Sequence, residues 1–176
     1  MKLKNLKLYL RYDWPLHFIL LLTNWLPDNV VFMRLRGWLL RPFFAKCGSN
    51  LEVGRNVTFQ NPSKIHLGRD IYVAYGSCFL AGTEIYVGDE VMFGPYCVVV
   101  SANHTRLGYS YHYGAPDMQT IHIGNGCWLA SHVIVVPGTT IGDGSCVAAG
   151  AAARGMIASN VMVGGVPTAV IRNLES

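Results

Sequence analysis

The sequence has few charged residues, no cysteine pairs at metal-binding spacing and no apolar run long enough to span a bilayer. Charged residues make up 14% of the 176 residues, and the formal net charge is +4. There is no dense Lys/Arg patch and no RNA-binding signature, so nucleic acid is not an expected partner. Because 51% of the residues are apolar, the chain can bury the core of one substantial domain.

The cysteines are odd in number and show no CxxC spacing. They are Cys47, Cys78, Cys97, Cys127 and Cys146. This pattern favours neither a disulfide framework nor a structural zinc site. We therefore expect a protein of a reducing cytoplasm that binds no metal.

Residues 1–47 differ from the rest and form an N-terminal helical, amphipathic segment. Its apolar run from Leu16 to Leu26 is shorter than the roughly 20 residues of a membrane-spanning helix, and no small-residue cleavage site follows it. The basic residues ahead of this run are Lys2, Lys4, Lys7 and Arg11. Two interpretations stay open: helices that cap the fold and its oligomer, or a segment lying peripherally on the inner membrane surface through its tryptophans.

The second half of this segment, FMRLRGWLLRPFFAK, has helical periodicity. It predicts one helix with Phe32, Leu35, Leu39 and Phe43 on its apolar face.

From Val53 onward the chain is a six-residue repeat. Successive sixes include VGRNVT, LGRDIY, VAYGSC, FGPYCV, IGNGCW, LASHVI and IGDGSC, with a pause from Thr105 to Thr120. The first position is apolar and the fifth is usually small or β-branched, so both point to the same side of a short strand. We expect three sixes to close a triangular coil, with parallel coils stacked about 4.8 Å apart and the pause extruded as a loop at about 105–120.

Two stretches are specific enough to suggest a family. IHIGNGCWLASHVIVVPGTTIGDGSCVAAG and GGVPTAVIRN resemble the hexapeptide-repeat acyltransferases, in particular the galactoside, maltose and polysaccharide O-acetyltransferases. The resemblance covers residues 48–173. It implies an all-β, left-handed parallel β-helix domain over 48–176, acetyl-CoA as co-substrate, a homotrimer and a sugar acceptor.

His104 closes the last six before the pause. Counting in sixes places His104 above Glu84 and Asn103 above Thr83, so we expect Glu84 to orient the imidazole; Asp117, the only carboxylate of the loop, competes for that role. The resemblance implies that His104 is the catalytic base, a role that suits imidazole.

The loop also supplies candidate acceptor contacts. We expect these from His112 and Tyr111. The acceptor-binding asparagine of the family is missing from VAYGSC, which offers Ser77 instead. A galactoside or maltose specificity therefore does not carry over.

The resemblance also implies the residues that bind acetyl-CoA. Those beside the thioester, pantetheine and adenine are Trp128, Ala130, Ser131, Ala149 and Pro167. Arg154 and Arg172 are the expected phosphate partners, because guanidinium groups pair well with phosphate. The chain reads Arg154-Gly155 where relatives carry Thr-Lys, so the cation is displaced by one residue.

These features predict an acetyl-CoA-dependent sugar O-acetyltransferase of surface polysaccharide (O-antigen or exopolysaccharide) biosynthesis. In the predicted reaction the sugar hydroxyl attacks the thioester directly, with His104 as the general base. One alternative is an N-acetyltransferase on an amino-sugar nucleotide. Alternatives from other classes are a non-catalytic scaffold and a gamma-type carbonic anhydrase. The last needs three converging imidazoles, and the sequence lacks a histidine pair at the required spacing.

Overall fold

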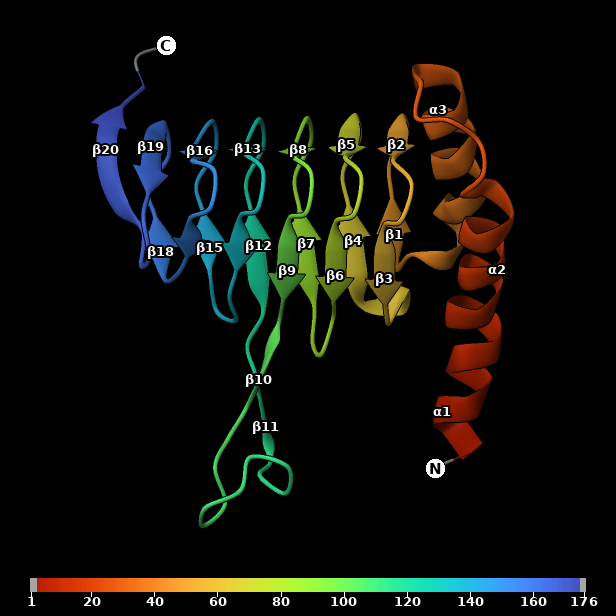
Figure 1. The fold of residues 1–176 in the computed structure, drawn as a ribbon, viewed down its shortest axis with the longest axis horizontal. Coiled ribbons are helices and arrows are strands. Elements are labelled where there is room, and N and C mark those ends of the chain that lie inside the picture. Colours follow the sequence, from red (N-terminus) through yellow and green to blue (C-terminus); the bar gives the residue numbers. More distant parts are fainter. Residues whose placement is uncertain (1–2, 175–176) are drawn as a thin grey trace.

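The computed structural model describes residues 3–174. Short strands wind into a triangular prism whose three walls are largely parallel sheets, with the N-terminal helices at one end and the C-terminal hairpin β19–β20 at the other (Figure 1). The fold is thus a parallel β-helix with an N-terminal helical segment, as predicted.

Each wall takes one strand from each coil. Sheet A contains β1 (Lys46–Cys47), β4 (Ile65–Leu67), β7 (Ile85–Val87), β12 (Ile121–Ile123), β15 (Thr140–Ile141) and β18 (Met156–Ile157). Sheet B contains β2 (Leu51–Val53), β5 (Ile71–Val73), β8 (Met92–Phe93), β13 (Trp128–Leu129), β16 (Cys146–Val147), β19 (Val161–Gly164) and the antiparallel β20 (Ala169–Asn173). Sheet C contains β3 (Thr58–Gln60), β6 (Cys78–Leu80), β9 (Val98–Val100), β14 (Ile134–Val135) and β17 (Ala152–Ala153).

The core is a column of inward side chains at the positions that the repeat predicts. Phe79, Phe93 and Val99 occupy first positions of sixes and are fully buried, and Val91 and Val133 do the same at fifth positions. Equivalent residues of successive coils pair directly, for example Phe79 with Val99. The six-residue count therefore sets which side chains each coil buries against the next.

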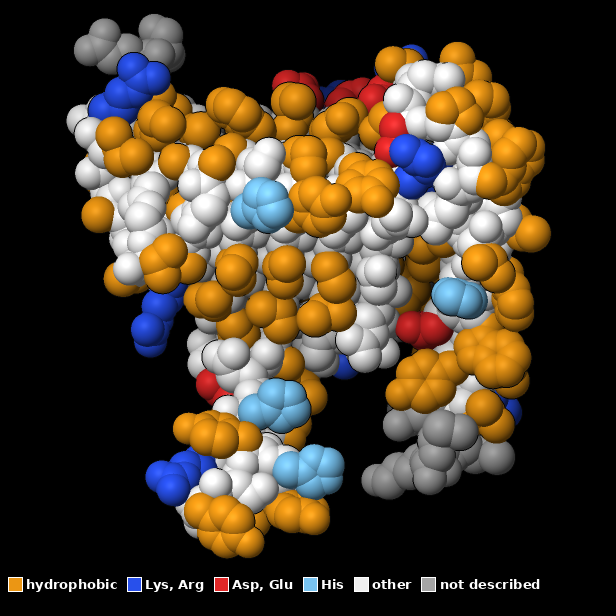
Figure 2. Space-filling model, in the orientation of Figure 1, with side chains coloured by type: hydrophobic (Ala, Val, Ile, Leu, Met, Phe, Trp, Pro, Cys, Tyr) orange, Lys and Arg blue, Asp and Glu red, His pale blue; other side chains and the backbone are white. Residues whose placement is uncertain are grey.

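The outer face of sheet C is apolar as well. Cys78, Leu80, Val98 and Val100 are half-buried there, and Ile134 is exposed. Figure 2 shows apolar side chains spread over the face of the coil stack in front of β6 and β9. Outward β-branched and aliphatic side chains on a wall of this kind are typical of a surface that meets another chain.

Helices close the first coil. They are α1 (Leu3–Leu8), the π-helix η1 (Tyr9–Asp13), α2 (Trp14–Thr23), α3 (Val30–Leu40) and the 3-10 helix η2 (Arg41–Phe43); a further 3-10 turn, η3 (Pro62–Lys64), lies between β3 and β4. Sheet A begins at Lys46, two residues ahead of the predicted domain boundary. Among the described residues, no helix is both long and apolar enough to cross a membrane.

The predicted apolar face of the second helical stretch is wrong. α3 buries Met33, Arg36, Gly37 and Leu40. A Cβ at position 37 would lie 1.7 Å from the carbonyl oxygen of Leu51, so glycine is what lets α3 approach β2. The buried face includes an arginine, which a search for apolar periodicity assigns to solvent.

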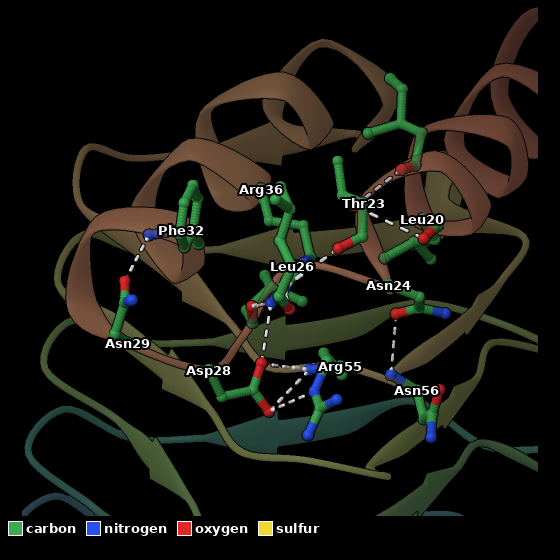
Figure 3. A network of polar contacts seen from close by, with 12 residues as sticks. Leu20, Thr23, Asn24, Leu26, Asp28, Asn29, Phe32, Arg36, Arg55 and Asn56 are labelled. Carbon is green, nitrogen blue, oxygen red and sulfur yellow. Dashed lines mark hydrogen bonds and ion pairs between the residues drawn. The ribbon is translucent and has the colours of Figure 1, made fainter.

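Arg36 organises the corner between α2, α3 and the first coil (Figure 3). Its guanidinium is fully buried and donates to Asp28 Oδ1 (3.2 Å) and to the carbonyl oxygens of Val53, Thr23 (3.3 Å) and Leu26 (3.1 Å). Asp28 in turn accepts from the backbone N–H of Arg55 at 2.9 Å. The helical segment is therefore a cap bonded to the end of the prism.

Candidate functional site

The hexapeptide pattern breaks at a two-stranded hairpin that projects from the corner between sheets C and A (Figure 1). Its strands are β10 (Ala102–His104) and β11 (Pro116–Met118), paired antiparallel with His104 opposite Pro116. The chain leaves the coil after Ser101, slightly earlier than predicted. His104 is exposed, and no hydrogen bond to its imidazole is found within residues 3–174.

The predicted register of His104 over Glu84 is wrong. Because the chain turns outward after Ser101, it is Ser101 Oγ that bonds Thr83, donating to its carbonyl oxygen (2.8 Å) and accepting from its N–H (3.0 Å). The carboxylate of Glu84 instead lies 2.7 Å from His66 Nε2. Glu84 therefore does not orient His104 within this chain, and Asn103 does not lie over Thr83.

The loop carboxylate, Asp117, does not face His104 either. Asp117 pairs with Asn103 across the hairpin, and successive residues of a strand point to opposite sides, so both lie on the face away from His104. Asp117 Oδ2 accepts from Gln119 Nε2 at 2.9 Å. Asn103, Asp117, Gln119 and Arg154 line a polar pocket of about 380 Å³ at the base of the hairpin.

The tip of the hairpin presents the predicted acceptor contacts. Tyr111 and His112 are exposed, and the ring of His112 packs edge-on against Tyr113 with centroids 4.7 Å apart. Thr105 closes the loop by donating from its N–H to the carbonyl oxygen of Ala115. The hairpin thus carries one imidazole at its base and a second, with aromatic rings, at its tip.

A second pocket, of about 400 Å³, lies at the corner between sheets B and C. It brings together four of the predicted cofactor residues, Trp128, Ala130, Ser131 and Ala149. The other lining residues are Tyr72, Met92, Gly94 and Pro95. A Cβ at Gly94 would lie 2.7 Å from the Ser131 nitrogen, so the floor is made by closely packed small residues under one half-exposed indole.

The sequence did not lead us to place Tyr72 and Met92 in this pocket, although their position in the repeat indicates it. Both occupy the sixth position of a six, as Trp128 does, and they pair in register along sheet B. The same row continues from Trp128 through Cys146 and Met162 to Arg172. Arg172 therefore lies three strands from Trp128, roughly 14 Å at the usual strand spacing.

The remaining predicted residues fall in different places. Ser77 is fully buried: its hydroxyl donates to the carbonyl of Gly94 (3.1 Å) and accepts from the N–H of Cys97 (3.2 Å). The prediction that Ser77 binds an acceptor is therefore wrong, because a fifth position points inward. Pro167 is exposed in the connection between β19 and β20, and Arg154 lines the hairpin pocket instead of the Trp128 pocket.

No cluster of three or more His, Cys, Asp or Glu side chains able to hold a metal ion occurs in the described part of the chain.

A parallel β-helix with a projecting histidine hairpin and a pocket of small residues beside a tryptophan defines the class of hexapeptide-repeat transferases. Comparisons with known proteins support this assignment. Residues 120–155 match the family model described as "Bacterial transferase hexapeptide (six repeats)".

Two curated relatives extend the match. Galactoside O-acetyltransferase of Escherichia coli (strain K12) is 34% identical over 137 residues, which cover 78% of this chain and 68% of that protein. A protein of the same strain predicted to be the colanic acid biosynthesis acetyltransferase WcaF is 33% identical over 84% of this chain and 79% of its own length.

Solved structures agree. A galactoside acetyltransferase in complex with coenzyme A superposes with a TM-score of 0.84 and 30% identity, over 99% of this chain and 84% of that one. An N-acyltransferase from Bacillus cereus is 16% identical over 76% of this chain and 85% of its own, with a TM-score of 0.61, which shows the fold alone. The chain belongs to the hexapeptide-repeat acetyltransferase family.

Proposed function

We propose that this acetyltransferase moves an acetyl group from acetyl-CoA to a sugar hydroxyl, with His104 as the general base. The observation that carries the proposal is the position of His104: an exposed imidazole, without a partner in the described part of its own chain, at the base of a projecting hairpin. Such a group is free to accept a proton from a bound ligand.

In the proposed reaction, the acceptor oxygen attacks the thioester carbonyl carbon while His104 takes its proton. The C–S bond breaks, the imidazolium returns the proton to the leaving thiolate, and an acetyl ester and CoA are formed. No covalent enzyme intermediate is needed, because holding both substrates against one base supplies much of the acceleration.

The Trp128 pocket is the proposed donor site. Ala130 and Ala149 leave room for a pantetheine chain to approach the backbone, and Trp128 offers an apolar wall beside the thioester. The row along sheet B leads from this wall to Arg172, whose guanidinium suits a phosphate. Pro167, at the same end of the prism, is assigned to the adenine end of the donor.

We infer that the working unit is a homotrimer whose sites are shared between chains. His104 projects at the corner between sheets C and A, whereas the Trp128 pocket lies at the corner between sheets B and C. Sheet C separates them, so one chain does not bring base and donor together. The apolar outer face of sheet C is the proposed contact surface between chains. Arg154 lies in the pocket on the hairpin face away from His104, and we propose that it meets a donor phosphate from that side.

The proposed acceptor is a sugar of a surface polysaccharide or its precursor, held by Tyr111 and His112. The relatives named for galactoside and colanic acid acetylation support a sugar hydroxyl. Hydroxylamine lability of the product distinguishes an acetyl ester from an amide.

The test is release of CoA thiol from acetyl-CoA over a panel of sugars, nucleotide sugars and lipid-linked glycans. We expect His104→Ala to lower kcat about 10²- to 10⁴-fold, the usual contribution of a general base. The matched control is His122→Ala, which removes another exposed imidazole, stacked on Tyr86 in sheet A. Equal turnover by His104→Ala and the native chain would show that His104 is not the base.

A further inference from the structure

The N-terminal helix α2 is apolar on both sides. Its inner side buries Leu16 and Leu20 against the first coil. Its outer side exposes an apolar stripe of Trp14, Phe18, Leu21 and Leu22, and Trp25, in the turn that follows the helix, is 77% accessible. A helix that is apolar all round is normally buried, so the outer stripe calls for a partner.

The stripe continues onto α3. Val31, Leu35 and Trp38 are exposed at i, i+4 and i+7 spacing and therefore lie along one side of that helix. Figure 2 shows apolar side chains covering the outer edge of both helices, at the end of the prism away from β20. We call these eight residues, listed here together, the outer helical surface: Trp14, Phe18, Leu21, Leu22, Trp25, Val31, Leu35 and Trp38.

The free charges around this surface are of one sign. Over residues 6–45 the only carboxylates in the sequence are Asp13 and Asp28, and both point at the first coil. Asp13 Oδ1 accepts from the N–H of Asn61 at 3.0 Å, and Asp28 accepts from that of Arg55. The cations Lys7 and Arg11 are exposed. The free charge beside the apolar stripe is therefore positive.

We propose that the outer helical surface binds an anionic lipid bilayer, lying in the interface without crossing it. Apolar and tryptophan side chains flanked by cations match acyl chains beneath anionic headgroups. A second copy of the chain fits less well, because a two-fold contact would pair two identical surfaces that both carry free positive charge. The partner is thus a membrane surface.

Membrane binding places the catalytic hairpin near the lipid. The hairpin that carries His104 leaves the third coil, two strand spacings or roughly 10 Å along the prism from the first coil, on which the helices pack. This step rests on the proposed function: a hairpin near the helical end of the prism suits an acceptor glycan attached to a membrane lipid.

The experiment measures co-sedimentation of the full chain with vesicles of phosphatidylglycerol and phosphatidylcholine. We expect the triple variant Phe18→Ser, Leu22→Ser, Trp25→Ser to lower the partition coefficient about a hundredfold, because three apolar side chains no longer enter the interface. The matched control is Met156→Ser, which removes an exposed apolar side chain on β18 at the other end of the prism. Lys7→Glu and Arg11→Glu should each weaken binding about fivefold, and raising the salt should weaken it further.

Two further readouts keep the test decisive. Light scattering reports the oligomeric state, and thiol release with a water-soluble acceptor reports the active site. Retained thiol release by the triple variant, with lost vesicle binding, supports the proposal and shows that the chain is folded. Absence of vesicle binding by the native chain, or unchanged binding by the triple variant, overturns it. A smaller oligomer of the triple variant, with no vesicle binding by the native chain, assigns the surface to a second copy instead. Vesicle binding and light scattering do not depend on His104, so they test this proposal even if the proposed reaction is wrong.

Discussion

Replacing Arg36 with methionine should detach the helical cap from the prism. The substitution keeps much of the side-chain volume but removes the guanidinium that donates to the carbonyls of Val53, Thr23 and Leu26 (Figure 3). The Thr23 carbonyl keeps the N–H of Leu26, so the carbonyls of Val53 and Leu26 bear the loss. Each buried acceptor left without a donor costs about 1–3 kcal/mol. Asp28 also loses its buried partner, although it keeps the N–H and guanidinium of Arg55.

Because Asp28 is 23% exposed and keeps Arg55, the lost ion pair adds little, and we expect Arg36→Met to cost about 2–6 kcal/mol through the two carbonyls. The assay is urea unfolding followed by the fluorescence of the tryptophans, three of which lie in the cap. The transition of the cap should move to lower urea while that of the prism moves less, since stacked repeats unfold with limited coupling.

The matched control lies two residues away on the same helix. Arg34 pairs with Glu52 at 2.9 Å, but its side chain is 56% exposed. Exposed ion pairs are worth at most about 1 kcal/mol, so Arg34→Met should barely shift the transition. If Arg36→Met and Arg34→Met destabilise the cap equally, the buried network does not hold it, and the reasoning fails.

The remaining predictions concern the donor pocket and the buried thiols. Trp128→Ala should raise KM for acetyl-CoA about tenfold or more, because the pocket loses its apolar wall; Tyr86→Ala, an outward aromatic on sheet A, is the control, and an unchanged KM would remove Trp128 from the donor site. Burial raises the pKa of the Cys97 thiol from 9.0 to about 11, and that of Cys47 likewise. Both thiols are therefore neutral in the folded chain at pH 8, and Cys97 should react with a disulfide reagent only after unfolding; labelling at the rate of a free thiol in the native chain would contradict this. Since the unfolded thiols ionise first, the free energy of unfolding should be independent of these groups below pH 9 and fall as the pH rises towards about 11, which unfolding curves at pH 8 and pH 10 can check.

The candidate site shows where local pattern reasoning works and where it fails. Trp128, Ala130, Ser131 and Ala149 meet in one pocket because they lie on adjacent coils, whose spacing the repeat specifies. Counting in sixes could not predict which residue lies beside His104. Counting assumes that the chain stays in the coil, whereas it leaves at Ser101 and pairs with its own return strand.

The repeat of six determined the solenoid by itself. Period-two alternation forces first and fifth side chains inward, so the core, the strand order and the outward sixth-position row follow from the sequence. The departure of the hairpin, the Glu84–His66 contact and the burial of Arg36 were decided only by the tertiary structure. The physical reason is that these three features depend on which distant backbone and side-chain groups compete for the same hydrogen bonds, and neither periodicity nor spacing records that competition.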